Sequence, residues 1–186
     1  MLLEKVNVPE SMRGNWKIER FTTDENGCFL ESLRGRRIPA NETFTRLMRG
    51  GTLVMSDTPD EMRDHYAAVM KAMGSCLING LGLGMVLKAV LKKSEVTDVT
   101  VVEISSEVLE MVSPHYQDSR VTFIHASAFD YQPPKGKRYG MVWHDIWDFI
   151  CADNIPEMHR LHRKYGRRAD WQGSWARERC ERYSRQ

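Results

Sequence analysis

The feature that most constrains this sequence is a short apolar run that enters three alternating glycines. Residues 76–78 are typical of a strand, Gly80, Gly82 and Gly84 follow it, and a helical stretch leaves the turn. A second apolar strand then ends in a single carboxylate, Glu103. Glycine suits such a turn because a side chain would hinder both the tight backbone and the approach of a ligand. The spacing predicts a strand–turn–helix–strand unit that presents an acid to ribose hydroxyls.

Size and composition describe an ordinary globular chain. Its 186 residues, 41% apolar and 28% charged, are enough for one domain with a buried core. No run of about 18 apolar residues is present, so we expect no membrane partner. The four cysteines are scattered without zinc spacing, and the first residues lack the apolar core of a secretory signal. We therefore expect reduced thiols and a cytoplasmic protein.

Strand and helix patterns alternate after the glycine turn. The expected strands are 75–79, 99–103, 121–125 and 139–144, with helices over 85–93 and 106–112. Strands separated by helices need crossover connections, so the pattern predicts an α/β fold with a Rossmann-like, mainly parallel sheet. After the fourth strand we expect only helices, because Trp171 and Trp175 lie one helical turn apart.

The residues before the glycine turn predict a β-rich lead-in. Residues 43–48 and 52–55 flank two glycines, as the strands of a hairpin do. Thr58 and Glu61 then form a capping-box pattern, which predicts one helix over 58–73. These patterns divide the chain into a lead-in, a Rossmann-like core and a basic helical end, with bounds 1–57, 58–150 and 151–186.

The carboxyl ends of the predicted strands should form one crevice, because ligands bind there in open parallel sheets. Glu103 would accept both ribose hydroxyls; its alternative is an exposed acid at a strand end. Ile104 and Phe129 would enclose an adenine or belong to the core. Ser127, next to Ala128, would bond the adenine edge or only stabilise a turn.

Two aspartates follow the fourth strand. Asp145 and Asp148 could bind an amine, hold a metal or remove a proton, and Trp147 offers an aromatic face to a sulfonium or ammonium group. The alternative is a helix cap beside a packed tryptophan. His159 and His162 lie three residues apart without an evident third metal ligand, so we expect surface histidines and no metal site.

These residues together resemble the class I S-adenosylmethionine-dependent methyltransferase superfamily, most closely its spermidine-synthase-like branch, over about residues 43–150. The resemblance implies S-adenosylmethionine or decarboxylated S-adenosylmethionine as cofactor, held by the glycine turn, Glu103, Ile104 and residues 127–129. It implies that Asp145 and Asp148 are catalytic. It also implies that Trp147 and His65 contact a small-molecule substrate.

The sequence departs from that pattern in several places. Ile78 and Leu83 stand where an acid usually holds the amino-acid end of the cofactor, Ser127 replaces an adenine-binding acid, and Asp64 replaces a tyrosine. The pattern also ends after four strands where the superfamily has three more, which predicts a C-terminally shortened fold. Its open edge would then be covered by the 155–186 helices or by a second subunit in a homodimer.

The leading function is methyl transfer to an unidentified acceptor. One alternative is a spermidine-synthase-like aminopropyl transfer, with the two aspartates binding the amine. The other is a non-catalytic fold that binds a partner or nucleic acid through its basic end. Residues 157–186 hold nine Lys or Arg against four acids, which favours contact with a phosphate backbone or an acidic neighbour.

Overall fold

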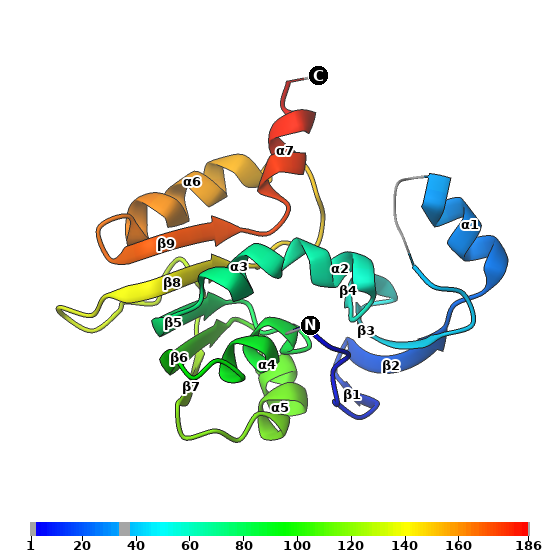
Figure 1. Ribbon diagram of the computed structural model, residues 1–186, viewed down its shortest axis with the longest axis horizontal. Helices are drawn as coiled ribbons and strands as arrows, with labels where there is room; N and C mark the ends of the chain where they lie inside the picture. The colour runs from blue at the N-terminus through cyan, green and yellow to red at the C-terminus, as the bar shows by residue number, and fades with distance from the viewer. Residues whose placement is uncertain (1–2, 34–37, 186) are drawn as a thin grey trace.

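The computed structural model describes residues 3–33 and 38–185, which form two sheets side by side (Figure 1). The first sheet is antiparallel in the order β1-β2-β3-β4, and the second is parallel in the order β7-β6-β5-β8-β9. The strands of the first are β1 (Ser11–Arg13), β2 (Trp16–Thr22), β3 (Thr43–Arg49) and β4 (Thr52–Ser56). Those of the second are β5 (Gly74–Asn79), β6 (Val96–Glu103), β7 (Val121–His125), β8 (Tyr139–His144) and β9 (Ala169–Ser174).

The described helices are α1 (Glu25–Leu33), α2 (Pro59–Asp64), α3 (Tyr66–Lys71), α4 (Met85–Leu91), α5 (Ser106–Val112), α6 (Asn154–Tyr165) and α7 (Arg177–Tyr183), with a 3₁₀ turn over Ser113–His115. Of these, α3, α4 and α5 pack on one face of the parallel sheet and α6 packs on the other, whereas α1 lies away from it beside the antiparallel sheet (Figure 1). Cys76 and Ile78 of β5 face the core that holds α3, α4 and α5, whereas Leu77 faces Leu161 and Tyr165 of α6. This alternation is the two-residue period of a strand buried on both faces. No described helix is both long and apolar enough to cross a membrane.

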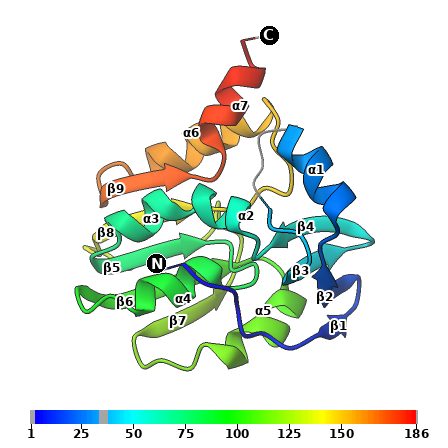
Figure 2. The ribbon, with the colours of Figure 1, turned by 45° about the vertical axis from the view of Figure 1, so that its right-hand side comes forward.

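The four parallel strands expected after residue 74 are confirmed, but the expectation that the sheet stops there is wrong. Residues Ala169–Ser174 form β9, which pairs in parallel with β8 along its length. The Trp171 ring stacks on that of Trp143, with centroids 6.2 Å apart and planes 8° apart. A spacing of four residues fits a strand face as well as a helical turn, so Trp171 and Trp175 did not identify a helix. Residues 151–185 therefore contain a helix, a strand and a helix, as Figure 2 shows.

The prediction of a single helix over 58–73 is also wrong, because the helix is interrupted at His65. Helix α2 ends there and α3 begins there, with His65 at φ −95° and ψ −4°. The capping box does not form as expected. The Thr58 side chain makes no capping bond, and Glu61 Oε2 accepts instead from the backbone N–H of Ser56 at 2.9 Å. The interruption turns the His65 side chain into the core, where none of it is exposed.

The two sheets share one hydrophobic core. Ile18, Leu47 and Met55 of the antiparallel sheet belong to the same cluster as the residues of β5 and α4. The buried Asp57 carboxylate connects three segments, because it accepts from the backbone N–H of Val6 at 2.9 Å and of Thr45 at 2.6 Å. The antiparallel sheet therefore packs against the crevice end of the parallel sheet (Figure 1).

Candidate functional site

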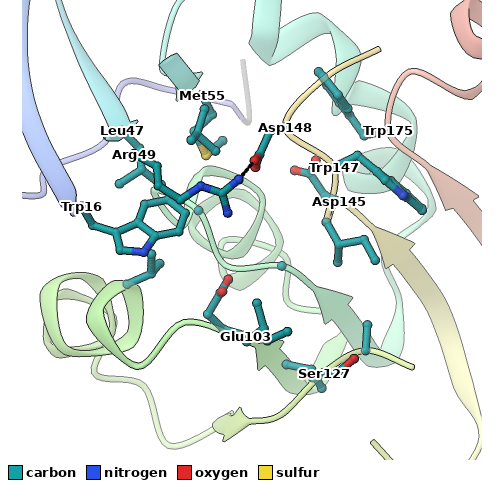
Figure 3. A pocket seen from close by; sticks show the side chains of 18 of the residues that line it. Trp16, Leu47, Arg49, Met55, Glu103, Ser127, Asp145, Trp147, Asp148 and Trp175 are labelled. Carbon is teal, nitrogen blue, oxygen red and sulfur yellow. Dashed lines mark hydrogen bonds and ion pairs between the residues drawn. The ribbon is translucent and has the colours of Figure 1, made fainter. Parts of the chain in front are cut away.

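A pocket lies between the two sheets, at the carboxyl ends of β5, β6 and β8 (Figure 3). One side comes from the parallel sheet and its loops, as the crevice rule predicts. The opposite side comes from β2, β3 and β4 of the antiparallel sheet. The expected residues that line it are Gly80, Gly82, Glu103, Ile104, Ser127, Ala128, Phe129, Asp145, Trp147 and Asp148.

The glycine turn needs its glycines for reasons inside this chain. Gly80, Gly82 and Gly84 have φ values of 95°, 51° and 75°, which L side chains rarely adopt. A Cβ at Gly80 would collide with the backbone oxygen of Asp145, and one at Gly84 with the Tyr116 ring. A Cβ at Gly82 would collide with the Met55 sulfur. The turn is thus packed tightly against the loop after β8 and against β4.

Glu103 ends β6 beside this turn and does not point into bulk solvent. Its Oε2 accepts from the backbone N–H of Leu81 at 2.8 Å, and its Oε1 accepts from that of Ser105 at 2.9 Å. The residue is 8% exposed and lines the pocket. A carboxylate offers about four lone-pair sites, so each oxygen can accept one more bond from a ligand. Glu103 thus fastens the glycine turn to the strand end with acceptor capacity left.

The loop after β7 closes a second side of the pocket. Ile104, which directly follows β6, lines the pocket beside this loop and is 69% exposed. Ser127 Oγ accepts from the backbone N–H of Phe129 at 3.2 Å, so it stabilises the turn. Two basic residues of α6 hold this loop: Lys164 Nζ donates to the Phe129 carbonyl at 2.8 Å, and the Arg160 guanidinium lies 4.8 Å from the Phe129 ring centroid. Part of the basic C-terminal segment therefore has an intramolecular role.

The two aspartates have different partners. Asp148 forms an ion pair with Arg49 of β3, whose guanidinium lies 5.2 Å from the Trp16 ring centroid. Figure 3 shows this pair crossing the pocket between the two sheets. Asp145 instead lies 3.8 Å from His65, measured between Oδ2 and Nε2. The sequence predicted that a cationic ligand would face both aspartates. For Asp148, the cation is instead the Arg49 guanidinium of this chain.

The electrostatic setting of Asp145 favours its protonated form. Burial raises the pKa of this carboxyl well above its ordinary value, and the nearby carboxylates of Glu61, Asp64 and Glu103 raise it further. The backbone N–H of Asp145 donates to the Asn79 carbonyl at 2.8 Å, which fixes the start of the loop. The ionised form of Asp145 is therefore less stable than that of an exposed aspartate.

His65 and Trp147 are placed differently. Trp147 lines the pocket, and its Nε1–H donates to Glu157 at 2.7 Å. His65 is fully buried behind Asp145, does not line the pocket, and contacts the Trp143 ring edge-on at 5.9 Å. It is therefore placed to act on Asp145, not to touch a substrate directly.

Other lining residues were not expected from the sequence: Trp16, Arg49, Met55 and Trp175. They come from β2, β3, β4 and the residue after β9, so no local motif connects them. Met55 Sδ accepts from the backbone N–H of Leu83 at 3.1 Å. The buried Trp175 Nε1 has no hydrogen-bond partner among the described residues. Only the packing of one sheet against the other brings these side chains together.

The α6 histidines do not form a metal site within the described residues. His162 Nδ1 faces the Arg177 guanidinium at 3.2 Å, so its Nε2 carries the proton and donates to Ser174 Oγ at 2.9 Å. Burial, aided by the Arg177 charge, lowers the pKa of His162 to about 4. This tautomer also prevents His162 from acting as a base towards Ser174.

The comparisons with known proteins concern the fold. Neither a known family pattern nor a curated protein sequence matches the chain. Among solved structures, it is similar to spermidine synthase from Thermotoga maritima, with 15% identity and a TM-score of 0.52 over 90% of this chain and 53% of that protein. It is also similar to N-methyltransferase NodS from Bradyrhizobium japonicum WM9, with 9% identity and a TM-score of 0.49 over 66% of this chain and 70% of that one.

A third similar structure is the 23S rRNA methyltransferase ErmE, with 15% identity and a TM-score of 0.44 over 60% of this chain and 43% of that one. At these identities the likeness concerns the fold alone. The chain spans about half the length of the spermidine synthase that it matches. It therefore shares with that spermidine synthase an α/β fold with a parallel sheet.

Proposed function

We propose that the pocket binds S-adenosylmethionine or its decarboxylated relative, and that the protein transfers a methyl group to a small-molecule acceptor. The observation that carries the proposal is the buried Glu103 carboxylate beside the Gly80–Gly84 turn, with one backbone N–H already on each oxygen. The shared fold supports it, because ligands bind at this end of a parallel sheet.

The lining residues fit the nucleoside half of such a cofactor. Glu103 has acceptor capacity for a ribose diol, and the exposed Ile104 side chain and the Phe129 ring offer apolar faces for a base. The other half fits less well. Met55 takes the Leu83 N–H, and Ile78 and Leu83 are buried apolar side chains with no charge to offer an amino-acid end. A full amino-acid end therefore requires Met55 to move.

The chemistry needs few groups from the protein. The bound sulfonium compound would supply an electrophilic methyl carbon. Holding the acceptor in line with that carbon contributes most of the rate, because orientation replaces a bimolecular encounter. Asp145 would take the proton that the acceptor nitrogen or oxygen loses, and its raised pKa makes it a stronger base than an exposed aspartate. Since only ionised Asp145 can accept that proton, the rate should rise with pH until Asp145 is fully ionised.

Calorimetry with S-adenosylmethionine tests the proposal. We expect binding by the wild-type protein and a loss of at least tenfold in Glu103→Gln, which keeps the size of the side chain but removes its charge. Glu110→Gln is the matched control, because Glu110 is exposed on α5 and should leave affinity unchanged. No heat with wild-type protein at millimolar S-adenosylmethionine and 5′-methylthioadenosine would contradict the proposal.

A further inference from the structure

His65 is buried in a way that local structure does not explain. It is 0% exposed, and neither ring nitrogen makes a hydrogen bond to any described residue. Buried polar groups are almost always bonded, because an unmade bond costs about 1–3 kcal/mol. An imidazole buried without a partner therefore calls for an explanation elsewhere in the molecule.

The nearest charged group gives that explanation. His65 Nε2 lies 3.8 Å from Asp145 Oδ2, which is longer than a hydrogen bond. The Asp145 side chain is 19% exposed and lines the pocket, so His65 lies on its inner side. Bonds between catalytic groups are often long before a ligand binds, and an approach of about 1 Å would close this one.

The backbone is built to direct this contact. The predicted continuous helix is interrupted at His65, which ends α2 and begins α3. The Trp143 ring packs edge-on against the imidazole at 5.9 Å and limits its rotation. Asp145 is fixed from the other side by its N–H bond to Asn79 and by the close approach of its carbonyl to Gly80.

We propose that His65 is the positioning residue of Asp145: its neutral imidazole donates Nε2–H to Oδ2 and leaves Oδ1 facing the acceptor. The proposal rests on the role of Asp145 in the proposed function. The other charged groups that face Asp145 are the carboxylates of Glu61, Asp64 and Glu103, which all favour its protonated form. His65 is the group on the inner side that can stabilise the ionised form.

The protonation state of His65 agrees with this role. Burial lowers the pKa of the imidazole to about 4, so His65 is neutral at pH 7 and carries one ring N–H. A neutral imidazole can donate from Nε2 while Nδ1 keeps its lone pair. A hydrogen bond to the carboxylate favours ionised Asp145, so removing the donor should raise the Asp145 pKa.

The test measures the Asp145 carboxyl carbon by NMR as a function of pH, with 5′-methylthioadenosine present and absent. In His65→Phe, which fills the space without a donor, we expect the Asp145 pKa to rise by at least one unit. His65→Gln should restore it to within about 0.3 units, because its amide N–H can reach the Nε2 position. Tyr66→Phe, exposed on α3 next to the interruption, is the matched control and should change nothing.

An unchanged Asp145 pKa in a folded His65→Phe would overturn the proposal, as would a rise that His65→Gln does not reverse. Thermal unfolding of each variant separates loss of the fold from loss of the donor. The titration can be measured without any bound cofactor. A protein that binds no adenosyl compound but shows the expected shift would therefore refute the proposed function and keep the His65–Asp145 pair.

Discussion

Single side chains decide what the pocket can hold. Met55 covers the glycine turn, with its sulfur against Gly82 and on the N–H of Leu83. Arg49 neutralises Asp148, so an amine acceptor would have to compete with a guanidinium already in place. Both residues come from the antiparallel sheet, and both line the pocket.

Replacing Met55 should change which adenosyl compounds bind. We expect Met55→Ala to raise the affinity for S-adenosylmethionine relative to 5′-methylthioadenosine by about tenfold, because it frees the Leu83 N–H and opens the turn. Calorimetry with both ligands measures this ratio. A general loss of structure weakens both affinities together and cancels in the ratio.

Leu53→Ala, on the exposed side of β4, is the matched control for Met55→Ala. The role assigned to Met55 would be refuted if its variant bound both ligands more weakly by the same factor.

Among the elements, β9 is the edge strand that the sequence did not predict. It extends the parallel sheet beyond β8 and is followed by Trp175, which lines the pocket. Its Gly173 lies where two indole rings meet: a Cβ there would be 2.6 Å from the Trp171 ring and 2.9 Å from the Trp143 ring. The strand thus depends on a residue that would weaken a helix.

Gly173→Ala therefore distinguishes the strand from the expected helix, because the change in unfolding free energy has opposite signs in the two cases. In β9 the added methyl overpacks the tryptophan pair, so we expect a loss of about 1–3 kcal/mol in unfolding free energy. In a helix the same change would stabilise by about 1 kcal/mol. Urea unfolding measures the difference.

Gly27→Ala is the control for that experiment, because Gly27 lies in α1 and a Cβ there meets only the Asp24 carboxyl at 3.4 Å. We expect it to be neutral or stabilising. A stabilised Gly173→Ala would show that the segment does not pack as β9.

At the scale of the whole molecule, the two sheets should unfold as one cooperative unit. They share a single hydrophobic cluster, and the buried Asp57 carboxylate joins the N-terminal segment, β3 and the start of α2. The boundary expected at residue 57 is therefore a connection within a continuous core.

Removing the Asp57 carboxylate tests whether the two sheets unfold as one cooperative unit. Asp57→Ala leaves the buried N–H groups of Val6 and Thr45 without their acceptor, so we expect a loss of about 2–4 kcal/mol. Tryptophan fluorescence and far-UV circular dichroism should follow one urea transition, and its midpoint should fall to the same lower urea concentration for both probes. Asp57→Asn keeps one acceptor oxygen and should lose less; two separate transitions would contradict the single unit.

The sequence by itself determined the parallel strands, the glycine turn and the place of Glu103, because strand period, glycine conformation and strand-end position are local properties. It did not determine β9, where a four-residue tryptophan spacing fits both a helix turn and a strand face. It also did not determine Met55, Arg49 or the His65–Asp145 pair. Those contacts join residues up to 99 positions apart. The packing of one sheet against the other brings Met55 and Arg49 to the pocket, and the packing of the α2–α3 segment beside the end of β8 brings His65 to Asp145.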